Sequence, residues 1–544
     1  MKVAEAVGRA LAEVGVDHVF GVVGSGNFHV TNAMVAAGSR FVASRHEGGA
    51  ATMADAYART SGKVAAVTVH QGCGLTNAMT GIAEAAKSRT PVIVLAAEVS
   101  EPKSNFYVDQ DALARSVGAV TTRITSPETA VEEACAAVGE ALHGRHTVLL
   151  NLPLQMQGRD VPGETVAALP PGPDPVLPER TELETLGGML DRAERPVFIA
   201  GRGSRGEGCR DALADLADRH GALLATSAVA RGLFNGNPWY LDVSGGFASP
   251  LAAELIRGAD LIVGWGCALN MWTMRHGRLI APDATVVQVD DDPTALGVHR
   301  DIDLGLTGDV LATARLALAA AGPHREGYRR ADLRGRIEAE ARWRDVPFDD
   351  TSTEDRIDPR TLSIALDDVL PADRVVGVDS GNFMGYPSMY LAVPDEYGFC
   401  FTQSFQSIGL GLATTIGAAL ARPDRLPVAA LGDGGALMSA VELDTVRRLG
   451  LPMVVVVYND DAYGAEVHHF RPDGFRVDTV SFPPTDIAAI ARGYGFEAVT
   501  VRKAADLDGV AGWVAGDRSR PLLVDAKVVS DRGAWWLEEA FRGH

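Results

Sequence analysis

Two aspartates that follow apolar runs carry the clearest chemistry of the sequence. Asp433 comes after the run 427–431, inside the sequence Gly-Asp-Gly-Gly, and Asp460 comes shortly after the run 453–457. Because the carboxyl ends of neighbouring parallel strands share one crevice, these two carboxylates can meet around one Mg²⁺ ion. The glycines beside Asp433 let the backbone approach an anion, and the free amides at a helix start attract phosphate. This stretch therefore predicts a site for Mg²⁺ bound to an oligophosphate.

The elements that position these groups alternate between strand and helix. The runs 427–431 and 453–458 predict parallel strands, with 436–450 as the helix that crosses between them. The same alternation covers the rest of the chain, so we expect an α/β fold of three consecutive doubly wound domains with mainly parallel sheets, each a copy of one architecture. The proline-rich stretch 170–175 marks the clearest boundary. The expected units are residues 1–169, 184–340 and 356–530, followed by a tail, 531–544, that is either a lid over the site or a helix docked for stability.

Composition and charge exclude several classes of protein. Apolar residues make up 47% of the 544 residues and charged residues 22%, as in an ordinary globular protein. Acidic side chains outnumber basic ones, 70 to 50, and the net charge of −20 disfavours nucleic-acid binding. The five cysteines are scattered, and no apolar run approaches the roughly 18 residues of a membrane span. We therefore expect a cytoplasmic enzyme that binds neither nucleic acid nor membrane.

A glycine pattern in the middle unit matches part of a dinucleotide-binding motif, but the rest of that motif is missing. Residues 201–206 read Gly-Arg-Gly-Ser-Arg-Gly, which matches the glycines of a dinucleotide-binding turn. The next expected strand, 222–226, ends in Thr-Ser instead of the acidic residue that would bind a ribose. We interpret the pattern as a plain tight turn and do not expect NAD.

The stretch 431–465 resembles the thiamine diphosphate enzymes, whose pattern is Gly-Asp-Gly followed, after a helix and a strand, by Asn-Asn or Asn-Asp. The whole chain looks most like the group of acetolactate synthase, benzoylformate decarboxylase and pyruvate oxidase, and within it like the acetolactate synthase large subunit. The resemblance implies that Asp433, Asp460 and the main-chain oxygen of Ala462 bind Mg²⁺. Many members carry Asn where Asp460 stands, so this chain has an extra negative charge near the phosphates. Three further residues would contact the diphosphate: Gly434, Gly435 and Tyr463.

Two more turns of the last unit match the cofactor site of this family. The segment 405–411 resembles the stretch that supports the aminopyrimidine, where the carbonyl of Gln406 would accept from the 4′-amino group and Ile408 would bend the cofactor. Without the resemblance, Ile408 would be read as a core residue. The other turn corresponds to the one at the far side of the diphosphate, and its candidates, which are otherwise simple turn residues, are Gly381, Asn382 and Phe383.

One carboxylate of the first unit has a role only through the resemblance. Glu47 opens an expected helix, where an acid is usually just a favourable partner of the helix dipole. In the family, a glutamate in this setting hydrogen-bonds N1′ of the pyrimidine and favours the 4′-imino tautomer that removes the C2 proton. Glu47 is therefore expected to be partly buried with a raised pKa. Because Glu47 and Asp433 belong to different subunits in the family, the resemblance implies a homodimer or homotetramer with active sites at the interface.

The substrate end is indicated by two turns of the first unit. Ser25 resembles the serine that benzoylformate decarboxylase presents to the substrate carboxylate, and His70-Gln71 precede the Gly-x-Gly turn that faces the thiazolium. His70 is either a proton relay or a satisfied structural group, and Gln71 is favoured as a substrate contact. Acetolactate synthases usually have small or hydroxyl residues at these two positions, so this chain departs from them here.

The flavin site of acetolactate synthases is not matched. The family holds FAD partly through an arginine after a Gly-Ala pair, whereas this chain has Gly266-Cys267-Ala268-Leu269 there, with Arg275 out of register. We expect thiamine diphosphate and Mg²⁺ as cofactors, without FAD.

The resemblance implies an enzyme that decarboxylates a 2-oxo acid and transfers the resulting enamine, an acyl-anion equivalent, to a carbonyl acceptor, as acetolactate synthase does. The alternative is a simple 2-oxo acid decarboxylase like benzoylformate decarboxylase. A flavin oxidase and a non-catalytic homologue are further alternatives. The presence of Glu47, Asp433 and Asp460 argues against the non-catalytic one.

Overall fold

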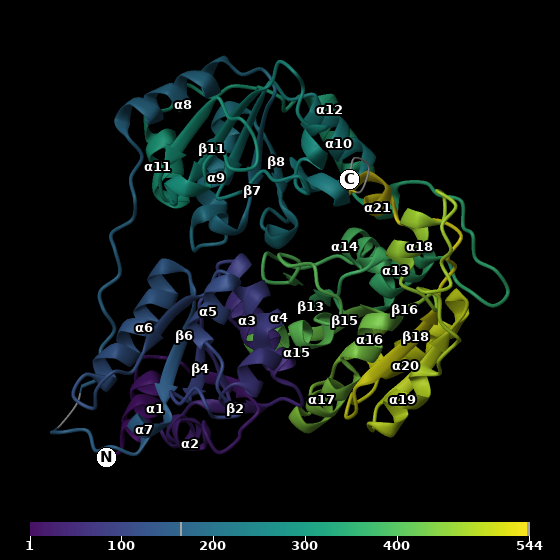
Figure 1. Ribbon diagram of the computed structural model, residues 1–544. Coiled ribbons are helices and arrows are strands. Elements are labelled where there is room, and N and C mark those ends of the chain that lie inside the picture. The colour runs from purple at the N-terminus through teal and green to yellow at the C-terminus, as the bar shows by residue number, and fades with distance from the viewer. Residues whose placement is uncertain (164–165, 541–544) are drawn as a thin grey trace.

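Three six-stranded sheets, each fully parallel, form the framework of the chain (Figure 1). A computed structural model describes residues 1–163 and 166–540, with side chains described up to residue 537. Helices cover both faces of every sheet, so the strands are buried on both sides and read as continuous apolar runs. The predicted α/β class with three doubly wound domains is confirmed.

The N-terminal domain carries its strands in the order β2-β1-β3-β4-β6-β5. Helices α1 and α6 cover one face of this sheet, and α3 and α4 cover the other. Its elements are α1 (Val3–Glu13), β1 (His18–Gly21), α2 (Phe28–Ala36), β2 (Arg40–Ala43), α3 (Glu47–Ser61), β3 (Ala65–Val69), α4 (Cys73–Lys87), β4 (Val92–Glu98), α5 (Gln110–Ser116), β5 (Val120–Arg123), α6 (Ala130–Gly144), β6 (Thr147–Pro153) and α7 (Leu154–Gln157).

The C-terminal domain repeats this topology, with the strand order β14-β13-β15-β16-β18-β17. The expected crossover helix 436–450 is broken at Ser439, whose hydroxyl donates back to the Gly435 carbonyl. Its elements are α13 (Pro359–Val369), β13 (Arg374–Val378), η7 (Asn382–Met384), α14 (Gly385–Tyr390), β14 (Phe399–Phe401), α15 (Gly411–Ala421), β15 (Leu426–Gly432), α16 (Asp433–Met438), η8 (Ala440–Glu442), α17 (Leu443–Leu449), β16 (Val454–Asn459), α18 (Gly464–Phe470), α19 (Ile487–Gly493), β17 (Glu497–Val501), η9 (Ala504–Leu507), α20 (Asp508–Ala515), β18 (Leu522–Lys527) and α21 (Trp535–Ala540).

The middle domain has a different strand order, β12-β11-β10-β7-β8-β9. Counted within the domain from the other edge, this is 3-2-1-4-5-6, the order of dinucleotide-binding folds. The expectation that all three units copy one architecture is therefore wrong for the middle one. Its elements are α8 (Arg180–Arg192), β7 (Pro196–Ala200), η1 (Arg202–Ser204), α9 (Cys209–His220), β8 (Leu223–Thr226), η2 (Ala228–Ala230), β9 (Tyr240–Val243), η3 (Gly245–Phe247), α10 (Pro250–Arg257), β10 (Leu261–Trp265), η4 (Arg275–Gly277), β11 (Thr285–Asp290), η5 (Pro293–Ala295), β12 (Leu304–Thr307), α11 (Val310–Ala320), α12 (Ala331–Glu340) and η6 (Trp343–Asp345).

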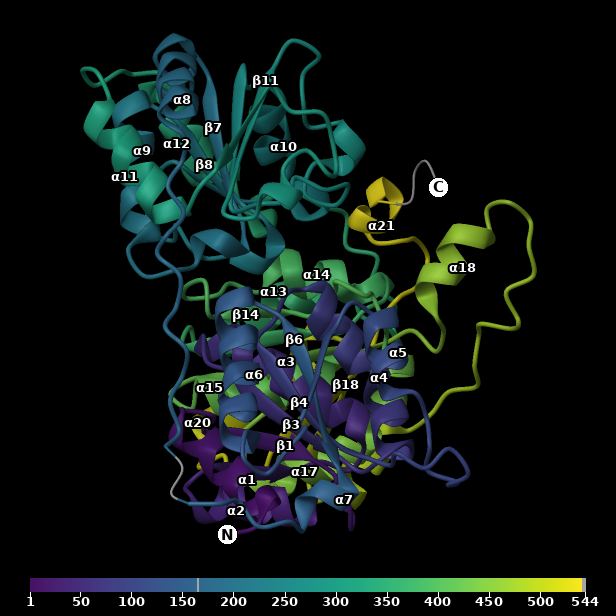
Figure 2. The ribbon, with the colours of Figure 1, turned by 60° about the vertical axis from the view of Figure 1, so that its left-hand side comes forward.

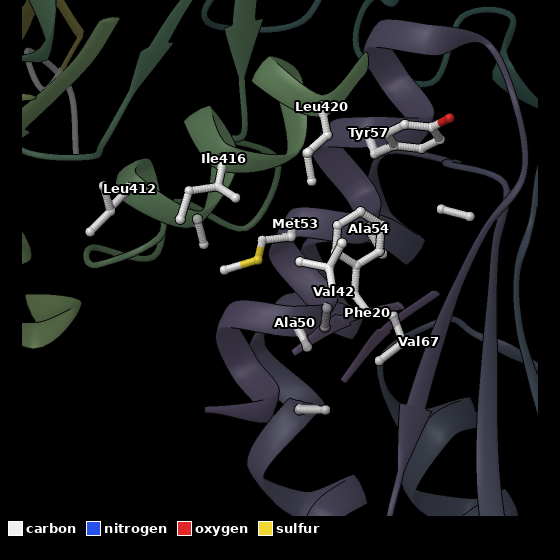
Figure 3. Packing of buried hydrophobic residues seen from close by; sticks show 14 of the residues in the cluster. Phe20, Val42, Ala50, Met53, Ala54, Tyr57, Val67, Leu412, Ile416 and Leu420 are labelled. Atoms are coloured by element: carbon white, nitrogen blue, oxygen red, sulfur yellow. The ribbon is translucent and has the colours of Figure 1, made fainter. Parts of the chain in front are cut away.

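The N- and C-terminal domains lie side by side beneath the middle domain, and a long connection climbs to the middle domain along one side (Figure 2). Helix α3 of the first domain packs against α15 of the last, and Met53 lies with Leu412 and Ile416 in one buried cluster (Figure 3). The approach is close: a Cβ on Gly417 would stand 2.1 Å from the carbonyl oxygen of Met53. Only glycine fits there, so the two helices meet backbone to backbone.

Ion pairs tie the middle domain to the N-terminal domain. Arg89 of the N-terminal domain lies 3.2 Å from Asp292, and Arg145 pairs with Asp291. Helix α21 lies between the middle and C-terminal domains. Within residues 1–163 and 166–540, none of the helices combines the length and apolar character that crossing a membrane requires.

Candidate active site

A cavity of about 1120 Å³ opens at the carboxyl ends of the C-terminal strands and extends to the middle domain. Most of the residues expected to hold the cofactor lie on its wall. The candidates that line it are Gly381, Asn382, Phe383, Gln406, Ile408, Asp433, Gly434, Gly435, Asp460, Ala462 and Tyr463.

The two aspartates lie together at the ends of adjacent strands. Strand β15 pairs with β16 up to Gly432 and Tyr458, so Asp433 and Asp460 follow at neighbouring strand ends. The two carboxyl groups are close enough that each affects the pKa of the other. Burial raises the pKa of both carboxyl groups, and the negative charge of Asp433 raises the pKa of Asp460 further. A divalent cation between them would relieve this repulsion.

The loop after β16 directs Asp460 toward Asp433 because its neighbours are held elsewhere. The Asn459 amide donates to Asp525 at 2.9 Å. Asp461, in the left-handed region with φ of 56°, accepts from Arg356 at 2.5 Å. Of the three polar side chains in Asn-Asp-Asp, Asp460 is thus the one that faces the cavity.

The glycines form a cradle that side chains would fill. A Cβ on Gly434 would stand 2.5 Å from the Tyr463 ring, and one on Gly464 would stand 2.4 Å from Asp460 Oδ2. Bare backbone beside two carboxylates is the combination that suits a diphosphate with Mg²⁺, since the amides can approach the anion and oxygen ligands suit the ion. The residues present therefore fit the implied cofactor.

The turn after β13 is joined to the C-terminal tail. Asn382 Oδ1 accepts from the Ala534 amide at 2.8 Å, and its carbonyl accepts from Trp536 Nε1 at 2.9 Å. A Cβ on Gly385 would stand 2.1 Å from the Trp536 ring, so this side chain seats directly on the backbone. Trp536 also lines the cavity and is 4% exposed. Of the expected tail 531–544, the part up to residue 540 is described, and residues 541–544 lie outside the described residues.

Within the described chain, Glu47 and the substrate candidates do not line this cavity. Glu47 begins α3, is partly buried, and accepts from the Asn77 amide at 3.1 Å. The two residues before it are held by the C-terminal domain, because the amides of Arg45 and His46 donate to Glu442 at 3.0 Å each. The start of α3 is thus fixed from the neighbouring domain.

The three substrate candidates form one cluster at the ends of β1 and β3. A Cβ on Gly24 would stand 3.0 Å from the His70 ring, and one on Gly26 would stand 1.9 Å from Gln71 Oε1, so the turn with Ser25 packs on both side chains. Gln71 is 5% exposed. Among the described residues, Gln71 Oε1 and His70 Nδ1 are buried without a hydrogen-bond partner. Such orphaned polar atoms point to a ligand or water that the protein accommodates here.

Three features at the site were missed by the sequence reasoning. Glu466, in the first turn of α18, lines the cavity, and its place directly after the metal-loop motif could have flagged it. The contact of Glu442 with the start of α3 left no signal, because it joins residues of distant domains. The glycine turn 201–206 was read as a plain tight turn, and it does line the cavity while packing on Gly266.

The arginine considered for FAD is engaged within the protein. Arg275 is 5% exposed and donates to the carbonyls of Gly245 and Ala248, both at 2.8 Å. Its guanidinium also lies over the Trp535 ring. That the protein binds neither FAD nor NAD stays a prediction.

Comparison with known proteins covers all three domains. Family models match in sequence order: "Thiamine pyrophosphate enzyme, N-terminal TPP binding domain" at residues 1–120, "Thiamine pyrophosphate enzyme, central domain" at residues 183–316, and "Thiamine pyrophosphate enzyme, C-terminal TPP binding domain" at residues 379–526.

Several relatives align along nearly the whole chain. A sulfoacetaldehyde acetyltransferase of Rhodobacter capsulatus is 28% identical over 99% of this chain and 96% of its own. A probable 2-ketoarginine decarboxylase of Pseudomonas aeruginosa is 30% identical over 93% and 89%. An acetolactate synthase large subunit of Parasynechococcus marenigrum is 28% identical over 92% and 83%. With matches to each domain and this coverage, the chain belongs to the thiamine pyrophosphate (thiamine diphosphate) enzymes, in the group of acetolactate synthase and pyruvate oxidase.

Proposed function

We propose that this enzyme decarboxylates a 2-oxo acid and transfers the resulting enamine, an acyl-anion equivalent, to a carbonyl acceptor. The observation that carries the proposal is the pair of buried Asp433 and half-buried Asp460 beside a cradle of glycines. Thiamine diphosphate, when bound, supplies a nucleophilic carbon and a sink for the electrons released with CO₂. A carbonyl acceptor agrees with the names of two relatives, an acetyltransferase and an acetolactate synthase.

The C-terminal domain would hold the cofactor at its diphosphate end. Asp433, Asp460 and the carbonyl of Ala462 would bind Mg²⁺, and the backbone of Gly434 and Gly435 would approach the phosphates. Further contacts would come from the other cavity residues: Gly381, Asn382, Phe383, Gln406, Ile408 and Tyr463.

Glu47 would act on the pyrimidine of a cofactor held by a second copy of the chain. Its carboxylic acid would hold a proton at N1′ and so favour the tautomer that can accept the C2 proton. The separation of Glu47 from the cavity within the described chain supports a site completed across a dimer or tetramer interface. Exposed apolar side chains flank both halves, namely Phe106 and Tyr107 near His70, and Leu437, Met438 and Val441 after the Gly-Asp-Gly-Gly turn.

The substrate would meet the cluster of Ser25, His70 and Gln71. Orphaned Gln71 Oε1 can accept a hydrogen bond, and His70 can deliver or remove a proton as charge changes on the substrate. The described cysteines are free thiols, which agrees with the cytoplasmic location that we also propose.

A simple decarboxylase is the second candidate. It is favoured by the relative named as a 2-ketoarginine decarboxylase and by a histidine at the substrate end, where a proton can replace the carbonyl acceptor.

The test is incubation of the enzyme, loaded with thiamine diphosphate and Mg²⁺, with a panel of 2-oxo acids in the presence and absence of aldehyde acceptors. CO₂ release that yields a coupled product supports the transferase, and release of the free aldehyde alone supports the decarboxylase. A visible flavin spectrum in the purified protein would revive the oxidase. Failure to consume any 2-oxo acid would contradict the proposed reaction class.

A further inference from the structure

Beyond the residues that would touch the cofactor, we infer that two buried carboxylates, Glu84 and Asp379, fix the segment 404–410 in its binding conformation before the cofactor arrives. The inference rests on the proposed function, in which Gln406 and Ile408 of this segment contact the aminopyrimidine. The two carboxylates are positioning residues, because they act through backbone amides.

Asp379 holds the second half of the segment. It follows β13, has no exposed surface, and its Oδ1 accepts from the amides of Gly409 at 3.0 Å and Leu410 at 3.2 Å. The same carboxylate packs on the phosphate turn, since a Cβ on Gly435 would stand 2.0 Å from Oδ2. Burial raises the pKa of Asp379 to about 6, against the amides that favour its charged form. Asp379 thus links the segment to the turn that carries Asp433.

Glu84 holds the first half of the segment from the N-terminal domain. This residue of α4 has no exposed surface, and its two oxygens accept from the amides of Ser404 at 3.0 Å and Phe405 at 2.6 Å. Its charge is balanced by Arg59, 2.7 Å away, which also pairs with Asp55 at 2.6 Å. Charged acceptors hold amides more strongly than neutral ones, especially when buried.

Gln406 stands between the two holding points in a strained conformation. Its φ of 60° lies in the left-handed region, which non-glycine residues adopt only when their surroundings enforce it. Its side chain is exposed, so the enforcement comes from the flanking backbone. Four amides bound to two carboxylates supply that enforcement, and the Gln406 carbonyl is presented in one orientation.

The arrangement offers a matched pair of variants. Glu84→Gln and Asp55→Asn each remove one buried negative charge from the side of Arg59, but only Glu84 touches the segment. We expect Glu84→Gln to weaken thiamine diphosphate binding about tenfold in calorimetry at saturating Mg²⁺, and Asp55→Asn to leave it near the wild-type value. Inorganic diphosphate with Mg²⁺ should bind equally to both variants, because it does not reach the pyrimidine end.

Hydrogen–deuterium exchange of the cofactor-free protein gives a second readout. The amides of Ser404, Phe405, Gly409 and Leu410 should be protected in the wild type, and Asp379→Asn should release the last two while Glu84→Gln releases the first two. Equal affinity losses in Glu84→Gln and Asp55→Asn, no loss in Glu84→Gln, or rapid exchange of the segment in the wild type would overturn the inference. Failure of the wild type to bind thiamine diphosphate at all would instead refute the proposed function.

Discussion

At the scale of single residues, the site combines two groups of like charge that a bound cation would separate. Asp433 is 7% exposed, Asp460 lies against it, and burial makes two adjacent negative charges costly without a cation. Asp460 is the residue that sets this chain apart from family members with Asn at the same place. The extra charge would tie the stability of the loop to the proposed metal more closely than an amide would.

The repulsion between Asp433 and Asp460 predicts that one substitution stabilises the metal-free protein but reduces the stabilisation that the metal gives. Asp460→Asn should raise the melting temperature of the metal-free protein by about 2 °C, because it removes the repulsion of Asp433. It should also reduce the increase in melting temperature that Mg²⁺ and thiamine diphosphate give together. The control is Asp461→Asn, which loses the pairing with Arg356 and should lower the melting temperature instead. Identical thermal scans for the two variants would argue against a charge pair at the site.

The proposed role of Glu47 predicts that its substitution lowers the turnover rate with little change in the affinity for thiamine diphosphate. Glu47→Gln should lower kcat by about 10²–10⁴, since the amide cannot supply the acid at N1′. The affinity for thiamine diphosphate should change by less than about threefold, since the diphosphate end would carry most of the proposed polar contacts. Turnover and calorimetric titration on the same sample separate the two effects. A variant with wild-type turnover would remove Glu47 from the mechanism.

At the scale of elements, helix α21 is joined to the site through Trp536. Its Trp536 is buried and bonded to the Asn382 carbonyl, and the Ala534 amide bonds to the Asn382 side chain. The turn that would contact the diphosphate is therefore supported from outside by the tail. This gives the tail a stabilising contact whether or not it also opens as a lid.

Removal of that contact should free the tail. Trp536→Ala should make the stretch 528–540 cleavable by a nonspecific protease at concentrations that leave the wild type intact, because the seat on Gly385 is emptied. Trp535→Ala is the control, since Trp535 is 38% exposed and should cost less. Time courses followed by mass spectrometry show the cleavage sites. Equal resistance of the two variants would mean that the tail is held by other contacts.

The local sequence pattern was sufficient to predict the helices and strands whose burial follows from their own apolar residues. The apolar runs before Asp433 and Asp460 became β15 and β16, and the acid Glu47 stands at the start of α3 as expected. The order of the middle strands was not predictable, because which strands become neighbours depends on packing between distant segments. The holding contacts of Glu442, Glu84 and Asp379 were hidden for the same reason, since each joins residues far apart in the chain.

At the scale of the whole molecule, the proposed site needs two chains. Within the described chain, Glu47 does not line the cavity that carries Asp433, and exposed apolar side chains such as Met438 stand beside Asp433. A twofold assembly would complete two equivalent sites from complementary halves.

Mixing two inactive variants tests this arrangement. Glu47→Gln and Asp433→Asn should each be inactive alone, but subunit exchange should restore about one quarter of the wild-type activity, because half of the dimers are mixed and each mixed dimer has one intact site. The measurement is turnover after unfolding and refolding of an equimolar mixture. Mixing two Asp433→Asn samples is the control. A site contained within one chain would give no recovery.

The meeting of α3 and α15 also bears on how the chain is made on the ribosome. The partner of Met53 is encoded beyond the entire middle domain, so one face of α3 has no apolar cover until the last quarter of the polypeptide emerges. At ordinary rates of synthesis this delay is on the order of tens of seconds. The nascent first domain therefore exposes an apolar surface throughout that interval. A chain released before residue 411 would be a natural client of chaperones.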